Sequence, residues 1–342
     1  MNGRLLVSRP RTRDSRAHVR PPAGVRRRGV VVRAALCAVM ALVALTAAAG
    51  SPVDASAGRL DTVTIVSPPS EPTALAFYAD ARGFFRRHGI DADVKVVEFG
   101  TAPAIIASGG AAFGPLDVGG FLSLKSRGGP VKLVAASGLY TPDAPTAVLV
   151  AAPGKHFSRA RQLVGRHVAV DRFGSIAYVA LVKWLKQGGV RVEDVDLAFH
   201  PFNDMLGLLK QGTVDAAVMP EPWVTQAKGR GATVVARVFS SVCSGSCLMT
   251  VWFARSDVDR NLAARFRLAI QDAAAWANRK ESIPAIDAIL ARQTKLEPRV
   301  LRAMAHSKFG TRLRFVRAQP WIDAYKELEL IPQSFTAPDL VR

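Results

Sequence analysis

The sequence predicts an α/β protein made of two lobes with mostly parallel sheets. From Leu60 onward, short runs of β-branched residues alternate with segments in which apolar residues recur every three or four positions. The alternation forms two successive series, and strand-like segments at 146–152 and 248–254 lie where the chain would pass between them. After the second of these segments the chain reads as almost wholly helical, which predicts a helical C-terminal tail.

The first series predicts the first part of lobe I, over residues 58–150. A strand at 62–66 is followed by the loop SPPSEP and by a helix that ends at His88 and Gly89, with Ser70 placed to cap this helix. Further strand and helix pairs are expected in VKVVEF with GTAPAIIASG, in LDVGG with FLSLKSRGG, and in VKLVAASG. Glycines end several of these helices.

The second series predicts lobe II, over residues 151–245. It begins with HVAVDRFGS and a helix that ends at Gly188 and Gly189, and continues through VDLAFHPFND, MLGLLKQG, VDAAVMPEPW and TVVARVF. Residues 246–342 are expected to return to lobe I and to add the C-terminal helices. The longest of these helices should bury a face that runs from Leu262 to Ala277.

The first 57 residues predict a signal peptide and a short linker. They hold ten arginines, no lysine and two acidic residues, and an apolar run spans residues 34–50. A basic segment before a short apolar run is typical of a secretory signal, whereas a membrane span needs about 20 apolar residues. We therefore expect an exported protein. An uncleaved anchor, a twin-arginine signal and a downstream start remain open, and Leu36 before Cys37 does not fit a lipidation site.

Charge excludes one class of partner. Without residues 1–57 the chain keeps 36 basic and 25 acidic residues, so the net charge falls from +19 to +11. The remaining basic residues are scattered, with no basic helix face and no aromatic residues interleaved for stacking on bases. We expect no nucleic-acid partner.

Cys243 and Cys247 form a C-x-x-x-C pair separated by Ser-Gly-Ser. Disulfides persist in exported proteins, so the sequence predicts a disulfide between them, and a metal pair or a redox site is the alternative. The histidines after residue 57 show no ligand-like spacing, and catalytic signatures such as G-x-S-x-G and H-E-x-x-H do not occur. We expect no metal, no cofactor and no enzymatic activity.

Six loops are expected to meet at one place. In open α/β sheets, ligands bind beyond the carboxyl ends of the strands, where loops lead into helices. The loops at that position are SPPSEP, FGTAP, DVGGF, RFGS, HPFND and MPEPW. The sequence therefore predicts a ligand cleft between the lobes, built from these loops.

Several long strings resemble a known family, the periplasmic binding proteins of the nitrate, sulfonate, taurine and thiamine-precursor ABC importers. The similarity runs from about residue 61 to the end, through ALAFYADARGFFRRHGIDADV, GPLDVGGFLSLKSRGGPVKLVAA, RQLVGRHVAVDRFGSIAYVALVKWLKQGGVRVEDVDL and LLKQGTVDAAVMPEPWVTQAKGRGATVV. It implies a type II periplasmic-binding-protein fold. It also implies a monomer that closes on a small solute and delivers it to a permease with its ATPase.

Gly174 and Ser175 are the first candidates for ligand contact. They open a helix directly after a strand, and free N–H groups with the helix dipole attract a sulfonate, carboxylate or phosphate. The family also places ligand at this position. The alternative is that Ser175 serves only as the helix N-cap.

The remaining candidates come from the other loops. Those expected to face Ser175 from lobe I are Gly100, Thr101, Gly119, Gly120 and Phe121, although each glycine could equally serve a tight turn. Glu221 and Trp223 would suit an amine or an aromatic ring, or else pack locally. Ser67 and Ser70 are weaker candidates. The favoured solute is thus a small anion such as a sulfonate, taurine or nitrate. A pyrimidine is the alternative, and an enzyme or a sensor on the same fold is less favoured.

Overall fold

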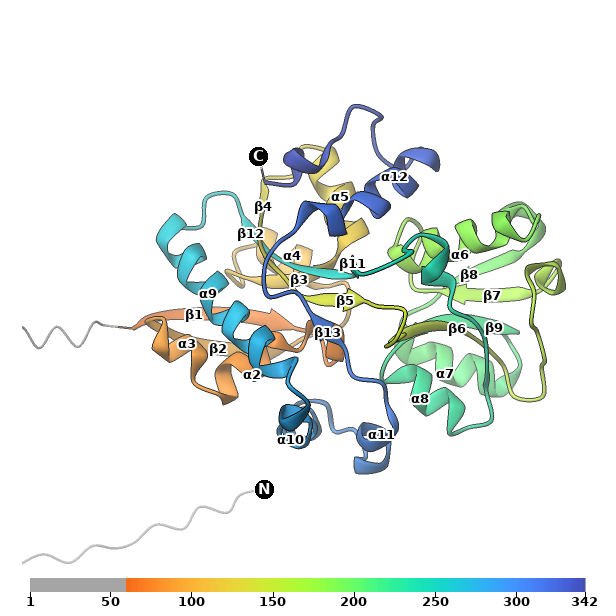
Figure 1. Cartoon of the computed structure of the whole chain (residues 1–342), viewed down its shortest axis with the longest axis horizontal. Helices are drawn as coiled ribbons and strands as arrows, with labels where there is room; N and C mark the ends of the chain where they lie inside the picture. Colours follow the sequence, from red (N-terminus) through yellow and green to blue (C-terminus); the bar gives the residue numbers. More distant parts are fainter. Residues whose placement is uncertain (1–59, 342) are drawn as a thin grey trace, which may run out of the picture. The chain divides into compact units, whose positions relative to one another are not determined.

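The computed structural model describes residues 60–341, and the predicted signal peptide and linker lie outside the described residues (Figure 1). Lobe I is built on a two-stranded and a three-stranded sheet that a single bridge joins, and lobe II on one five-stranded sheet. A further short sheet, here called the third sheet, lies between the lobes. In Figure 1, lobe I is on the left and lobe II, in green, is on the right.

Lobe I is built on five neighbouring strands. Their order across the lobe is β2 (Ile90–Val96), β1 (Asp61–Ser67), β3 (Gly114–Asp117), β12 (Thr250–Arg255) and β4 (Val131–Ala136). β1 and β2 pair in parallel, and a parallel bridge between Ile65 and Phe113 joins β1 to the start of β3. β12 is antiparallel to both of its neighbours.

Lobe II repeats this arrangement. Its strands lie in the order β8 (Asp196–Phe199), β7 (His167–Val170), β9 (Ala216–Pro220), β6 (Ala147–Ala151) and β10 (Thr233–Ala236). β7 is parallel to β8 and β9, whereas β6 is antiparallel to β9 and β10. In each lobe the antiparallel strand is the one that the chain forms on crossing from the other lobe. The prediction of a two-lobed α/β fold with mostly parallel sheets is confirmed.

Helices cover both sheets. Lobe I carries α2 (Leu75–Ala81), α3 (Phe84–Arg87), α4 (Ala102–Ala107), α5 (Val118–Ser126), α9 (Arg260–Ala277) and α10 (Ile283–Thr294). Lobe II carries α6 (Ile176–Gln187), α7 (Phe202–Gln211) and α8 (Trp223–Lys228). The tail adds α11 (Pro298–Ala303) and α12 (Gln319–Glu327). The short 3-10 turns include η1 (Glu71–Thr73) and η4 (Val238–Ser241).

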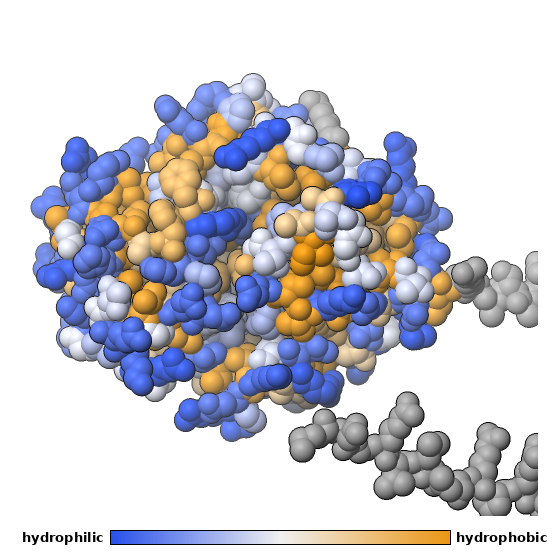
Figure 2. Space-filling view, turned by 180° about the vertical axis from the view of Figure 1, so that it is seen from behind, coloured by the Kyte–Doolittle hydropathy of each residue, from blue (hydrophilic) through white to orange (hydrophobic). Residues whose placement is uncertain are grey.

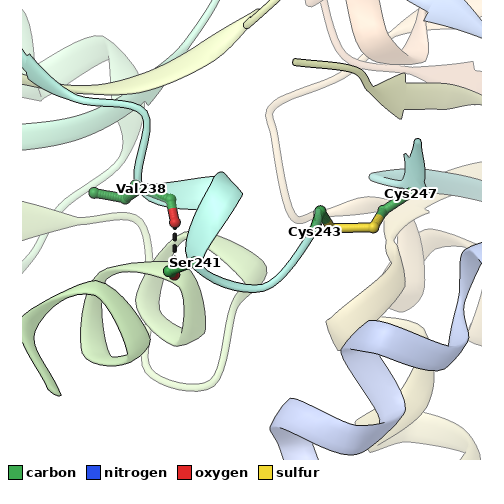
Figure 3. The surroundings of a disulfide bond; sticks show 4 residues. All are labelled: Val238, Ser241, Cys243 and Cys247. Carbon is green, nitrogen blue, oxygen red and sulfur yellow. Dashed lines mark hydrogen bonds between the residues drawn. A yellow bond between two sulfur atoms is a disulfide. The ribbon is translucent and has the colours of Figure 1, made fainter. Parts of the chain in front are cut away.

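The third sheet lies where the chain passes between the lobes. It pairs β5 (Gly138–Tyr140) with β11 (Cys247–Leu248) and β13 (Lys308–Phe309). Cys243 and Cys247 form a disulfide at the start of β11, with their Cα atoms 6.0 Å apart (Figure 3). The neighbouring turn η4 is held by the Ser241 hydroxyl, which donates to the carbonyl of Val238. The disulfide therefore lies at the second crossing.

Helix α12 packs against both lobes, through α5 of lobe I and α6 of lobe II. Its Tyr325 is fully buried and donates its hydroxyl to the carbonyl of Gly174 at 2.7 Å. Glu327 at its end pairs with Lys183 and Lys186 of α6. The tail thus adds contacts between the lobes besides the three strands of the third sheet.

Two local predictions need correction. Ser70 does not cap a helix, because the turn η1 follows it directly and α2 begins only at Leu75; the Ser70 hydroxyl makes no cap bond. The strand expected at 94–99 is β2, which begins at Ile90 and ends at Val96. The start of β2 was missed because Asp91 and Asp93 are unusual in a strand. An edge strand whose face is half exposed tolerates such acidic residues.

Candidate ligand-binding site

A small cavity lies between the lobes, and residues of both lobes line it. Its volume is about 40 Å³, room for two or three water molecules. Most of its lining is apolar, including the rings of Phe99, Phe202 and Phe239. The polar members of the lining are Ser70, Asp117, Asp171 and Thr250. We call this space the inner cavity.

A larger outer cavity of about 440 Å³ shares Phe99, Asp171 and Phe202 with the inner one. Trp223 lies in its wall and donates its indole N–H to Asn203 at 3.0 Å. All six loops that the sequence singles out contribute to the two cavities, with Ser70, Phe99, Asp117, Arg172, Phe202 and Trp223. The structure thus brings these loops together between the lobes.

An ion-pair cluster joins the lobes at these cavities. Arg172 of lobe II contacts Asp117 of lobe I through one guanidinium nitrogen and Asp171 through the other, the latter at 2.9 Å. Asp117 also caps α5 by accepting from the N–H of Gly120 at 2.9 Å. The carboxylates are nearly buried, with exposed side-chain fractions of 4% and 10%, whereas Arg172 is 36% exposed.

Burial changes the acid–base properties of this cluster. Desolvation raises the pKa of Asp171 to about 6, and the nearby Asp117 adds to the rise while Arg172 opposes it. Burial lowers the pKa of Arg172, but Asp117 and Asp171 outweigh this effect and raise it overall. Arg172 is therefore charged at every physiological pH, and Asp171 titrates closer to neutrality than an exposed carboxyl.

Ser175 lies at the start of α6, where the sequence places an anion. It is buried, and its hydroxyl accepts from the N–H of Tyr178 as a helix N-cap. The same hydroxyl donates to Asp171 at 2.5 Å. The negative charge that favours this helix end is thus supplied by the chain's own carboxylate.

Five further candidates line cavities. Ser70 lines the inner cavity, and its buried hydroxyl has no hydrogen-bond partner in the part of the chain that the structure describes. Gly100 and Trp223 line the outer cavity. Gly120 lines a neighbouring third cavity, as do Gly174 and Arg172.

The other candidates are not among the residues that line the inner or outer cavity. Ser67 is buried and donates to the carbonyl of Thr73, and Thr101 donates to the carbonyl of Glu98. Phe121 packs in the core of lobe I. Glu221 accepts from Thr225 and from the N–H of Ala305, and burial raises its pKa.

Gly119 has a packing role in this structure. A Cβ atom added to it would lie 1.5 Å from the hydroxyl of Tyr325. The absence of a side chain at Gly119 therefore allows Tyr325 of α12 to pack closely against α5.

Sequence reasoning did not single out Asp117, Asp171, Arg172, Phe99 or Phe202. Asp117, Arg172, Phe99 and Phe202 lie inside loops that it named, and Asp171 directly precedes one of them. A usable signal was present for Asp171. It lies four residues before Ser175, at the carboxyl end of a buried strand, which is where a side chain reaches the start of the next helix.

The fold and the cavity between two loop-bearing lobes define a binding-protein architecture. A family profile described as "NMT1/THI5 like" matches residues 72–280, more than half of the chain. The chain belongs to this family. No curated protein matches this chain.

Solved structures share the fold at low sequence identity. The periplasmic aliphatic sulphonate binding protein SsuA from Escherichia coli is 16% identical, with a TM-score of 0.66, over 82% of this chain and 92% of that one. The alkanesulfonate-binding protein SsuA from Xanthomonas axonopodis pv. citri, bound to MOPS, is 15% identical, with a TM-score of 0.68, over 84% and 99%. The desulfurization enzyme DSZB is 18% identical, with a TM-score of 0.61, over 82% and 96%. Most of these similar structures are binding proteins.

The surface is mixed in character. Figure 2 shows hydrophilic residues spread over the face opposite to Figure 1, with apolar residues in separate patches between them. Within residues 60–341, no helix is long and apolar enough to cross a membrane. The same part of the chain holds no cluster of histidine, cysteine and acidic residues that could bind a metal ion.

Proposed function

We propose that this protein is the extracytoplasmic solute-binding component of an ABC importer. It captures a small solute between its lobes and delivers it, as a monomer, to a membrane permease driven by an ATPase. Residues 1–57 direct export, 58–150 and 246–342 form lobe I with the tail, and 151–245 form lobe II, except that residues 147–150 belong to strand β6 of lobe II. The protein binds and releases its solute without changing it.

One observation carries this proposal. Six loops from two lobes line a shared pair of cavities, and the lobes are joined by three short strands. A sheet of two or three residues per strand bends more readily than a packed domain interface, so the lobes can separate to admit a solute and close on it. Family membership and the binding proteins among the similar structures support the same role.

An enzyme on this fold is the second candidate, and DSZB is a desulfurization enzyme with a similar structure. Both cysteines of the described residues are joined in a disulfide, which leaves no thiol nucleophile in that part of the chain. Among the described residues, His306 has two carboxylate partners, Glu71 and Asp287, and it lines neither cavity. The cavities therefore favour binding over catalysis.

Two solute classes enter the proposal. The sequence favours a small anion such as a sulfonate, taurine or nitrate, and two similar structures are sulfonate-binding proteins. The alternative is a pyrimidine. The lining of the inner cavity favours a ring-bearing solute, because Phe99, Phe202 and Phe239 offer flat apolar faces and little of the wall is polar.

A thermal-shift screen tests the proposal, with taurine, alkanesulfonates, nitrate and pyrimidines as solutes. A solute that binds the native state raises the melting temperature as its concentration rises. Ala177 of α6 lines the inner cavity, so Ala177→Leu should fill it and abolish the shift, whereas Ala177→Ser should keep it. A bound solute should also be taken up by cells that carry the protein and not by cells that lack it. A solute that the Leu variant binds as well as wild type, or binding without any effect on uptake, would contradict the proposal.

A further inference from the structure

The charges that face the two cavities are mostly negative. Asp117 and Asp171 line the inner cavity, and among the described residues no lysine, arginine or histidine does so. Glu98, Asp171 and Asp204 line the outer cavity, where Arg172 is the one cation of the described lining. This acidic cleft belongs to a chain whose net charge is +19. The local charge is thus opposite to the overall charge.

The carboxylates of Asp117 and Asp171 have spare hydrogen-bonding capacity. Each carboxylate oxygen can accept about two hydrogen bonds, and the bonds within the protein use one for each of the four oxygens. A third polar group, the unpartnered hydroxyl of Ser70, lines the same cavity and is buried. A buried hydroxyl without a partner costs free energy that a ligand group can recover. The inner cavity therefore offers acceptors and one hydroxyl to an incoming donor.

Arg172 is the counter-ion of Asp117 and Asp171. Its position indicates the shape of a ligand group that could replace it on these carboxylates. Its two terminal nitrogens each contact one carboxylate, so a planar group with two N–H donors fits the same gap. Arg172 lines the outer and third cavities but not the inner one, and its side chain is 36% exposed. It lies at the rim, from which a long side chain can move into solvent.

An anion would meet the opposite conditions. The buried N-terminus of α6 already faces Asp171, and a second negative group there would lie beside two carboxylates in a poorly solvated space. The phenylalanine rings around the cavity attract a cation through their faces. The charges, the hydrogen-bond acceptors and the aromatic rings around the cavity therefore all favour a positively charged ligand.

We propose that Asp117 and Asp171 bind a cationic, N–H-donating group of the solute, such as an amidinium, a protonated aminoheterocycle or an ammonium, in competition with Arg172. The proposal deepens the proposed function and depends on it, because it concerns the same cleft. Asp171, Asp117 and Ser70 determine specificity, and Arg172 sets the affinity by competing for the carboxylates. The apolar part of the solute lies against Phe99 and Phe202 towards the outer cavity.

Three probes of one shape and different charge test this proposal. Benzamidine is a cation, benzamide is its neutral counterpart, and benzenesulfonate is an anion. Binding of each is measured by calorimetry near pH 7.5 to wild type, Arg172→Gln and Asp171→Asn, with a melting curve for each protein. Asp257→Asn is the matched control, because Asp257 is an exposed carboxylate that pairs with Arg255 and lines neither cavity.

We expect wild type to bind benzamidine at least about tenfold more tightly than benzamide, the effect of one nearby opposite charge. Arg172→Gln should tighten benzamidine binding by a further factor of about ten, because it removes the competitor. Asp171→Asn should erase the preference for the cation, and Asp257→Asn should change nothing. Arg172→Gln and Asp171→Asn should thus each change the affinity for a cation and the affinity for an anion in opposite directions.

Three results would overturn the proposal. The first is that wild type binds benzenesulfonate more tightly than benzamide and that Arg172→Gln abolishes this preference. If Ala177→Leu still prevented binding, this result would reject the cation but leave the proposed function standing. The second is equal binding of benzamidine and benzamide by wild type and Asp171→Asn. The third is no benzamidine binding at millimolar concentration while another solute binds in the screen. If no solute binds at all, the proposed function fails first and this inference fails with it.

Discussion

Asp171→Asn should change how the stability of the protein depends on pH. The pKa of Asp171 is about 6 in the folded protein because of burial, against an unfolded value of 3.8. A carboxyl whose pKa is raised by folding stabilises the protein when it is protonated. This contribution is complete below pH 3.8 and is lost as the pH rises through 6.

The two pKa values fix the size of the effect. The contribution is close to zero at pH 7 and about 1.4 kcal/mol at pH 5, out of a maximum of about 3 kcal/mol. Asparagine cannot titrate, so the free energy of unfolding of wild type should rise by about 1.4 kcal/mol relative to the variant between pH 7 and pH 5. Groups common to both proteins, including His306, cancel in this difference.

Urea denaturation at pH 5, 6 and 7 measures the effect. The difference in unfolding free energy between wild type and variant should change little between pH 7 and pH 6 and should grow more steeply between pH 6 and pH 5, because its slope against pH follows the titration of Asp171 near pH 6. A constant difference across this range would show that Asp171 titrates below pH 5, and the account of its burial beside Asp117 would be refuted.

Two further predictions concern the contacts that hold the lobes together. Gly119→Ala places a methyl group on the hydroxyl of Tyr325, so it should break the hydrogen bond to Gly174 and destabilise the protein by about 1–3 kcal/mol. The control is Gly207→Ala, in an open position on α7, which should be neutral or stabilising. Equal effects of the two variants in thermal melts would contradict the packing role of Gly119. Replacing both Cys243 and Cys247 by serine should cost about 2 kcal/mol of unfolding free energy, the loop-closure value for so short a ring, and reductant should destabilise wild type but not this variant. Two alkylatable thiols in the native exported protein would reject the disulfide.

The fold could be predicted from the sequence because its pattern is regular. Strands β6 and β9 are continuous buried runs in which Val, Ala, Leu and Met predominate, and helix α8 after β9 ends at Gly229. Strand β13 of the third sheet could not be predicted. It has only two residues, Lys308 and Phe309, and a pairing of that length depends on β5 being nearby rather than on local propensity.

The meeting of the six loops could be predicted from the sequence, but the side chains that line the cavities could not. The rule that ligands lie beyond the carboxyl ends of strands depends on topology, and topology follows from the order of the elements. Which residue of DVGGF or RFGS faces the cavity depends on the other lobe. Asp117 and Arg172 meet across the cleft from positions 55 residues apart in the chain, and nothing local to either residue indicates its partner.

The cationic ligand proposed here illustrates why composition is a poor guide to specificity. A chain with a net charge of +19 suggests an anionic partner, and a helix start such as that of α6 suggests an anion site. At physiological ionic strength, however, exposed charges are screened beyond about 8 Å, whereas buried groups at contact distance are screened much less. The charged groups that line the inner cavity are Asp117 and Asp171, and the guanidinium of Arg172 is already shared between them. Because Asp171 fills the anion-attracting position at Ser175 from within the chain, the cleft retains a negative charge that the overall composition conceals.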